Sequence, residues 1–407
     1  MMTKKQYNKT SSRRSFLRKS AMLMGGASAY VWLNTNVAAA TTLASNAAST
    51  NTIGNKKLVW VFLRGAMDSL HTVVPKHDKQ MTILRPHLYN ALKPKLLSLN
   101  NDFGLHPALK HLHKLYTRKQ MSPIVAVASG YRERSHFDAQ DQMESGLDIT
   151  NHDSGWIARA LQQAQSNSSE NASAYALSRS VPIAMRGMSS NIETWYPSTL
   201  PEASPDLLSQ LHNLYQGDKS LEDSLSKVIK QKEMPSMQMK EKNRPNFRYL
   251  AERCAELLTN ENANCAMLEL NGWDTHNNQV GRLARLFAQL DGGLEHMQNT
   301  LGERWNDTLV IVSTEFGRTA AANGTQGTDH GTASNMFVLG GALPAMNSTL
   351  QGGKVLGQWP GLSPEQLYKN RDLMPTSDVR QWMARALSAH WGLSSLQIQR
   401  VFPDLLS

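Results

Sequence analysis

Short apolar runs alternate along the chain with longer segments of helical spacing. Continuous runs of this kind predict buried strands, and they occur at KKLVWVFLR (56–64), PIVAVAS (123–129), CAMLEL (265–270), TLVIVST (308–314) and NMFVLGG (335–341). Residues 281–301 instead repeat their apolar side chains at helical spacing, which predicts an amphipathic helix. Strands that are apolar throughout are typical of a sheet covered on both faces. The pattern therefore predicts an α/β fold in which helices sandwich a mostly parallel sheet.

The segment from about 155 to 262 follows a different pattern. It is polar in QQAQSNSSENASA and helix-like from about Pro205 to Asn260, and only PIAMR (182–186) looks like a strand. We therefore expect a helical insertion or cap on the sheet. Near the end of the chain, MPTSDVRQWMARALSAHWGL predicts one more helix, which a Pro-Thr-Ser-Asp cluster would cap.

The first residues have the pattern of an export signal. Residues 1–40 pass from the basic SSRRSFLRKS through the modestly apolar AMLMGGASAYVWL to the small residues of VAAATT. The apolar part is too short and too rich in glycine and alanine to span a bilayer comfortably. Arg13-Arg14, followed by Phe16-Leu17, resembles the twin-arginine signal, which is an address for the twin-arginine translocation machinery and not a permanent membrane anchor.

This signal implies a periplasmic or secreted protein that is cleaved near Ala40. Residues 41–55 are small and polar and predict a linker to a folded body at 56–407. The twin-arginine route is associated with proteins that fold before export, often around a cofactor. Cys254 and Cys265 would then reach a compartment that permits a disulfide, but two buried free thiols fit the pattern equally well.

The net charge of +10 does not indicate a nucleic-acid partner. Seven of the 43 basic residues lie in 1–40, which holds no acid, so 36 basic residues face 33 acidic residues in the rest of the chain. No basic-aromatic motif remains in that part. The sequence also lacks a glycine-rich phosphate loop.

Polar side chains follow or closely precede every predicted strand, at the edge where an open α/β sheet binds its ligands. Those of interest are Asp68, Ser69, His71, Arg132, Arg134, Ser135, His136, Asp274, His276, Glu315, Arg318, Asp329 and His330. Their carboxylates and imidazoles are the ligands of divalent metals such as zinc, manganese, calcium or iron. Because crowded carboxylates repel one another unless a proton or cation intervenes, a divalent metal is the expected cofactor.

Several of these residues also have a structural interpretation. Asp68 could cap the helix that follows it, and Ser135 with the acid three residues later matches a capping box. Arg318 could be an ion-pair partner. His276 and His330 could be structural, although both lie in polar loops flanked by glycine. Four other histidines fall within helical patterns and are interpreted as structural: His111, His113, His296 and His390.

The order of these motifs resembles the alkaline phosphatase and sulfatase superfamily. More closely, LVWVFLRGAMDSLHTVVP, GWDTHNNQ, STEFGRT, GTDHGTASNMFVLGGAL and DLMPTSDV resemble the domain-of-unknown-function 1501 family of exported proteins, over roughly 57–407. The resemblance implies an alkaline phosphatase-like fold with two metal sites. By position, Asp68 and Glu315 would belong to one site, and Asp274, His276 and His330 to the other.

The resemblance also implies catalytic roles. Ser135 would be the nucleophile at a helix N-terminus, where the dipole favours an anion, and Arg134 or Arg318 would clamp phosphate or sulfate oxygens. However, Glu315-Phe316 stands where the phosphatases carry Asp-His, so one nitrogen ligand is lost. SHFDA also lacks the context that sulfatases need for formylglycine, which favours a phosphoester or other ester hydrolase.

These observations predict an exported, metal-dependent hydrolase of phosphate or sulfate esters, acting on a small anionic ester or glycan. The alternative is a non-catalytic envelope protein of the same fold that binds an anionic glycan or a protein partner. The lost nitrogen ligand at Phe316 favours this alternative.

Overall fold

The computed structural model describes residues 53–165, 172–187, 192–197, 205–219, 221–226, 246–260, 263–346 and 350–406. The predicted export signal and the linker up to residue 52 lie outside the described residues. Among the described helices, none combines the length and the apolar character needed to cross a bilayer.

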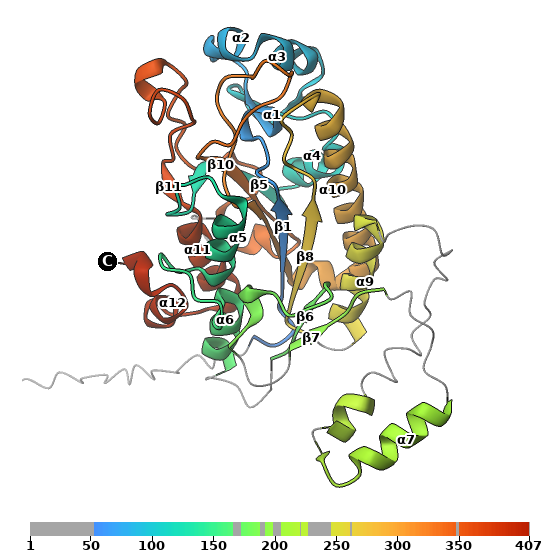
Figure 1. Ribbon diagram of the computed structural model, residues 1–407. Helices are drawn as coiled ribbons and strands as arrows, with labels where there is room; N and C mark the ends of the chain where they lie inside the picture. The colour runs from blue at the N-terminus through green and yellow to red at the C-terminus, as the bar shows by residue number, and fades with distance from the viewer. Residues whose placement is uncertain are drawn as a thin grey trace, which may run out of the picture. The chain divides into compact units, whose positions relative to one another are not determined.

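An eight-stranded sheet lies at the centre of the fold (Figure 1). In spatial order its strands are β11 (Ser377–Asp378), β5 (Met121–Ala128), β10 (Ser334–Leu339), β9 (Thr308–Thr314), β1 (Lys57–Arg64), β8 (Cys265–Asn271), β6 (Ala174–Ala176) and β7 (Ile192–Thr194). Among these strands, β10 is antiparallel to β9 and β5, and every other pairing is parallel. The predicted mostly parallel sheet is therefore confirmed.

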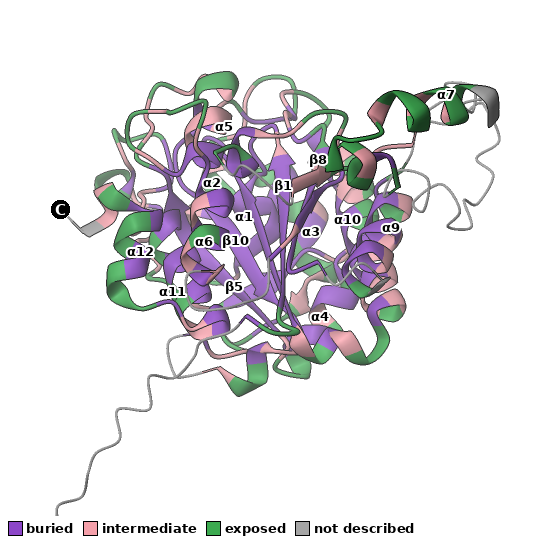
Figure 2. Cartoon of the chain, turned by 90° about the horizontal axis from the view of Figure 1, so that it is seen from below, coloured by how far each residue is buried: buried purple, intermediate pink, exposed green. Residues whose placement is uncertain are grey.

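The apolar strands are buried because helices cover both faces of the sheet. In β1, Val59 and Val61 belong to one core, while Trp60 and Phe62 point into the other. Helices α4 (Lys110–Thr117), α9 (Phe247–Asn260) and α10 (Gln279–Leu301) pack on the first face, and α6 (Trp156–Gln165), α11 (Val379–Trp391) and α12 (Ser395–Val401) on the second. Figure 2 shows the buried strands between these two layers. Continuous burial explains the unbroken apolar runs of the sequence.

The two helices predicted from spacing and capping are both present. Helix α10 covers the predicted 281–301 and buries its apolar stripe. Helix α11 begins after Asp378, whose carboxylate accepts a hydrogen bond from the backbone N–H of Arg380. The predicted cap cluster thus ends in a side chain that satisfies one of the free N–H groups of the first turn.

The predicted strand at 182–186 was wrong. Residues Ile183–Met185 form a short 3₁₀ helix, η2, whose side chains are buried. Its backbone bonds are local, from the N–H of Met185 to the carbonyl of Pro182 and from that of Arg186 to Ile183. An apolar run this short has no period that separates a strand from a buried turn.

The segment from 155 to 262 supplies helices and also part of the sheet. Helices α7 (Pro205–Tyr215) and α9 lie where the helical pattern from about Pro205 to Asn260 predicts helix, and α6 precedes that pattern. Strands β6 and β7 also come from this segment, and β6 pairs with β8 in register from Ala174 opposite Cys265. These strands are three residues long, which is too short for a recognisable alternating pattern.

A second small sheet and three short helices lie between β1 and α4. The antiparallel strands are β2 (Val73–Pro75), β4 (Phe103–Leu105) and β3 (Leu97–Ser98). The helices are α1 (Ser69–Thr72), α2 (Gln80–Leu84) and α3 (Pro86–Leu92), and they lie beyond the carboxyl end of β1 (Figure 1). These short helices therefore lie at the same edge of the main sheet as the loops that carry the polar motifs.

Candidate metal centre

The polar motifs converge at one edge of the sheet. Asp274 and His276 lie in the loop after β8, Glu315 directly follows β9, and His136 begins α5 (His136–Ser145) after β5. Because β10 runs antiparallel, the residues that precede it, including His330, reach the same edge as the carboxyl ends of its neighbours.

Four side chains form the centre of this convergence. The Nε2 atoms of His136 and His330 are 3.0 Å apart, and the Oδ1 atom of Asp274 lies 3.2 Å from the second and 3.5 Å from the first. The Nε2 atom of His276 lies 2.9 Å from the same Asp274 oxygen and 3.1 Å from His330. A tetrahedral ion with ligands at about 2.0–2.1 Å keeps them about 3.4 Å apart. The spacing of His136, Asp274 and His330 therefore fits one shared ion.

Each of the three imidazoles has its Nδ1 atom against an acceptor. The pairs are His136 with Glu315 Oε1 at 2.7 Å, His276 with Asp329 Oδ1 at 3.1 Å, and His330 with the backbone carbonyl of Arg134 at 3.1 Å. In a neutral imidazole, an acceptor at Nδ1 favours the ring proton there, which leaves the lone pair on Nε2. In that form the Nε2 atoms of His136 and His330 and one Asp274 oxygen would face one another as ligands of a cation.

The charges around Asp274 favour its ionised form. Burial raises the pKa of this carboxyl group, but the Arg318 guanidinium, which donates to Oδ1 at 2.8 Å, and the neighbouring His276 and His136 together outweigh burial and lower the pKa. Arg318 is buried, and its Nε and NH2 groups have no partner among the described residues. Two buried donor groups of Arg318 therefore have no hydrogen-bond acceptor among the described residues.

Glu315 lies behind His136 and orients it. Its carboxylate also accepts hydrogen bonds from the N–H of Gly65, the amide of Gln140 and the hydroxyl of Thr314, each at 2.8 Å. Burial lowers the pKa of His136, but the hydrogen bonds and charges of Glu315 and Asp274 together outweigh this and raise it. A carboxylate in this position fixes the ring orientation of a metal-binding histidine.

Asp68 and Glu315, which were predicted to share a metal site, have different partners in this structure: Arg85 for Asp68 and His136 for Glu315. Asp68 is fully buried and accepts a hydrogen bond from the N–H of Leu70, as the cap of α1. Both of its oxygens accept from Arg85 NH1, at 3.0 and 2.8 Å, and Oδ2 accepts from Gln279 Nε2 at 2.5 Å. The described contacts of Asp68 are thus those of a helix cap that is paired with a buried arginine. The described residues contain no second group of three metal-type ligands.

The predicted catalytic residues of the α5 region lie next to the cluster. Ser135 is the N-cap residue of α5, directly before His136, and its side chain makes no capping hydrogen bond. Arg134 has a left-handed backbone at φ 61° and presents its carbonyl to His330. Its guanidinium donates to Asp372 at 2.9 Å. Arg134 therefore contributes its backbone to the cluster, while its side chain is held by a buried acid.

Phe316 forms an aromatic wall of the cluster. Its ring stacks on His136 with centroids 4.9 Å apart and an interplanar angle of 24°, and it lies 5.4 Å from the ring of His330. Only 4% of Phe316 is exposed. Directly after Glu315, this chain thus has a buried ring that packs against two imidazoles.

His136 is the member of the cluster that was not assigned to the metal from sequence. Its signal was present, since it follows Ser135 at the expected start of a helix after a buried strand. Asp329 was also noted in the sequence without an assigned role, and it orients His276. Neither role follows from local pattern, because the partners of both residues come from distant segments.

Two glycines permit the close approach of the loops. Gly65 has φ +118°, and a Cβ atom there would lie 2.5 Å from the backbone nitrogen of Asp274. A Cβ atom at Gly327 would lie 2.3 Å from the backbone carbonyl of His276. Only glycine fits at such contacts, so these positions hold Asp274 and His276 against the neighbouring loops.

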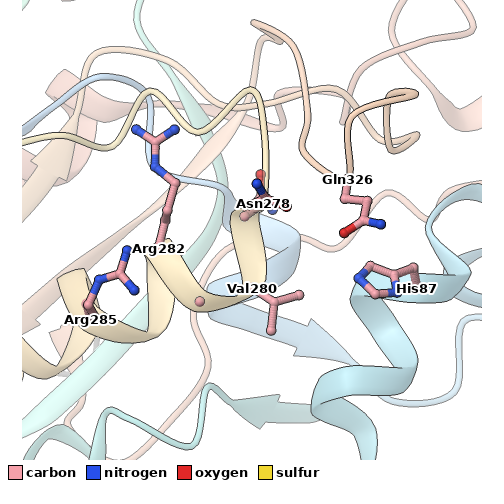
Figure 3. A pocket seen from close by; sticks show the side chains of 8 residues that line it. His87, Asn278, Val280, Arg282, Arg285 and Gln326 are labelled. Atoms are coloured by element: carbon pink, nitrogen blue, oxygen red, sulfur yellow. The ribbon is translucent and has the colours of Figure 1, made fainter.

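A cavity of about 250 Å³ lies at the start of α10 (Figure 3). Its first lining residue on this segment, Asn278, is two positions after His276 in the sequence. It is lined by His87, Asn278, Gln279, Val280, Gly281, Arg282, Arg285 and Gln326. Arg282 and Arg285 lie on the first two turns of α10, while His87 comes from α3. The walls therefore carry more positive than negative charge.

Several solved structures are similar to this chain at low identity. The alkaline phosphatase from the Antarctic bacterium TAB5 has 9% identity and a TM-score of 0.35, over 86% of this chain and 99% of its own. The phosphonate monoester hydrolase of Agrobacterium radiobacter has 10% identity and a TM-score of 0.34, over 74% and 70%. The phosphonoacetate hydrolase from Sinorhizobium meliloti 1021 has 9% identity and a TM-score of 0.30, over 65% and 57%.

No protein with a curated description matches the chain. The family model described as "Protein of unknown function (DUF1501)" matches residues 55–402, which agrees with the family predicted from the motifs. The chain belongs to the DUF1501 family.

Proposed function

We propose that the chain is a hydrolase of phosphate or sulfate esters that uses one divalent metal ion. The observation that carries the proposal is the convergence of three imidazole Nε2 atoms and one carboxylate oxygen, with every Nδ1 atom held by an acceptor. His136, Asp274 and His330 would hold the ion, and His276 is placed to join them. Because imidazole nitrogens dominate this set, zinc or iron is favoured over calcium.

The residues around the proposed ion suit an anionic ester. A divalent ion at this position supplies Lewis-acid polarisation of an ester oxygen and lowers the pKa of a bound water. Arg318, whose Nε and NH2 groups have no hydrogen-bond acceptor among the described residues, would bind a second oxygen of the ester. Phe316 would exclude water from one side of the centre. Arg282 and Arg285, on the wall of the cavity at the start of α10, would favour substrates with negative charge.

Elemental analysis of the full-length protein, purified without chelators, tests the proposal first. We expect about one equivalent of zinc or iron and hydrolysis of 4-nitrophenyl phosphate or sulfate that a chelator abolishes. Asp274→Ala should lose both metal and turnover. His113→Ala is the matched control, because this histidine contacts the carbonyl of Ser98 instead of the cluster. A folded protein that takes up no added metal would overturn the proposal.

A non-catalytic binding protein is the second candidate, and Phe316 is the observation that favours it. Its ring occupies a position that would otherwise supply a ligand, and Arg318 already neutralises Asp274. A protein that binds metal and an anionic glycan, but hydrolyses no ester in a broad screen, would support this candidate. Measurable turnover that disappears in Asp274→Ala would reject it.

Export through the twin-arginine machinery is a separate part of the proposal. It rests on Arg13-Arg14 and the apolar segment that follows. Replacing both arginines with lysine should retain the full-length precursor in the cytoplasm, as fractionation and immunoblotting would reveal. Unchanged export of that variant would reject this route.

A further inference from the structure

One buried side chain links several of the loops that surround the metal centre. Gln279 is the first residue of α10 and is fully buried. Its Oε1 atom accepts hydrogen bonds from the hydroxyls of Thr275 at 3.0 Å and Thr328 at 2.7 Å. Its Nε2 atom donates to Asp68 at 2.5 Å. The single amide therefore contacts three separate segments of the chain.

Both threonines lie within the motifs that carry the proposed ligands. Thr275 stands between Asp274 and His276, and Thr328 is two residues before His330. Both threonines are fully buried, and the N–H of Thr328 also donates to the carbonyl of Thr275 at 3.3 Å. Holding the two hydroxyls on one oxygen therefore sets the distance between the two ligand loops.

Asp68, the third partner of the Gln279 amide, connects the two loops to a buried ion pair. Asp68 is paired with Arg85, and both side chains are buried. Arg85 also donates to the carbonyls of Thr319 at 2.5 Å and Ala320 at 2.8 Å, in the loop that follows Arg318. The loops that carry Asp274, His330 and Arg318 are thus tied to one buried ion pair.

We infer that Gln279 is a positioning residue for the metal centre, which it serves by fixing Thr275 and Thr328 to the Asp68–Arg85 pair. This inference rests on the proposed function. The amide carries no charge and touches none of the proposed ligand atoms, so it acts through loop geometry alone. Its own backbone N–H donates to the carbonyl of Gln326 at 3.0 Å, so the side chain is not needed to begin α10.

Zinc titration of the full-length protein, monitored by competition with a chromogenic chelator, tests this inference. Gln279→Met keeps a similar side-chain volume and removes all three hydrogen bonds. Its zinc affinity should fall by about 10- to 100-fold, the range for residues that support metal ligands. Gln397→Met in α12 is the matched control, because Gln397 is also buried and hydrogen-bonded, to the carbonyl of Gln163 and to Ser394. We expect wild-type affinity in this control.

The absorption spectrum of bound Co²⁺ supplies a readout that a loss of stability alone would not change. The d–d bands report coordination geometry, and Gln279→Met should shift or weaken them at saturating Co²⁺, whereas Gln397→Met should not. Thr328→Val removes a single hydrogen bond to the same amide oxygen. It provides the second test if Gln279→Met does not fold, with a loss of affinity of several-fold expected.

Three results would overturn the inference, and they are distinguishable. Wild-type affinity and spectrum in folded Gln279→Met or Thr328→Val would reject the positioning role while the proposed metal centre stands. An equal loss in Gln397→Met would show that any buried glutamine has this effect. A wild-type protein that binds neither Zn²⁺ nor Co²⁺ would reject the proposed function, and the positioning role with it.

Discussion

Two polar sites at the same edge of the sheet contrast in how their carboxylates are neutralised. At the first, Asp68 is fully buried and receives hydrogen bonds from Arg85, Gln279 and the N–H of Leu70. At the second, Asp274 is 43% exposed and receives one arginine bond, while imidazole Nε2 atoms crowd the same oxygen. Both sites contain an Asp–Arg pair at 2.8 Å. The number of donors that reach the carboxylate separates the structural site from the candidate metal site.

The largest expected effect is the loss of metal from the second site. His330→Ala removes the imidazole that lies within 3.2 Å of the other three proposed ligand atoms. Bound zinc should fall from about one equivalent to less than about one tenth of that. Elemental analysis after gel filtration measures it. Asp68→Asn leaves all four proposed ligands in place, so it should retain more zinc than His330→Ala, and an equal loss in the two variants would remove the contrast between the two sites.

The next effect is on stability and belongs to the first site. Asp68→Ala leaves the guanidinium of Arg85 buried without its partner, which typically costs about 3–5 kcal/mol. Urea denaturation of the apo protein measures this free energy of unfolding. Asp274→Ala also leaves a buried guanidinium, that of Arg318, without its partner, but the carboxylate that it removes is 43% exposed, so its cost should be smaller than that of Asp68→Ala. Equal losses in the two variants would contradict the comparison.

Lowering the pH should reduce the free energy of unfolding through His71, a buried histidine that interacts with Asp68. Burial lowers the pKa of His71 to about 4, although the charge of Asp68 opposes this. Between pH 6.5 and about 4, the unfolded chain binds a proton at His71 that the folded protein does not. The free energy of unfolding should therefore fall as pH drops, with His71 contributing about 1.4 kcal/mol per pH unit. Urea denaturation at several pH values should give a shallower slope for His71→Gln, and an unchanged slope would contradict the assignment.

The smallest expected effects are on zinc affinity. They come from Glu315 and Asp329, the carboxylates that orient His136 and His276. Glu315→Gln weakens the partner of His136 Nδ1, and zinc affinity should fall by about 10- to 100-fold. Asp329→Asn changes the partner of His276, but this carboxylate is 53% exposed, so solvent can replace it and the loss should be smaller. Isothermal titration with zinc measures both. A larger effect at Asp329 would indicate that His276 is the more important ligand.

Much of the fold could be predicted from local pattern. Strands β1, β5, β8, β9 and β10 appear where continuous apolar runs occur, because a strand covered on both faces must be apolar throughout. The short strands β6 and β7 could not be predicted, and η2 was predicted as a strand. Such short elements take their conformation from their neighbours instead of from a period in their own sequence.

The candidate site could be predicted in part. Asp274 and His330 were placed at the correct sheet edge, since side chains that follow parallel strands gather there. Asp68 met the same criterion, yet its partner Arg85 comes from a segment for which the sequence offered no pattern. His136 and Glu315 contact each other although they are 179 positions apart in the chain. Local sequence therefore does not indicate which of the two is the proposed ligand and which one supports it.

The sequence by itself determined the α/β class, the order of the motifs and the membership of the DUF1501 family. These properties depend on apolar periodicity and on residue types along the chain, which need no knowledge of contacts. Only the tertiary structure decided which carboxylates meet arginines and which meet imidazoles. That outcome depends on the donors that distant segments bring within about 3 Å, because a hydrogen bond or ion pair acts only at that range.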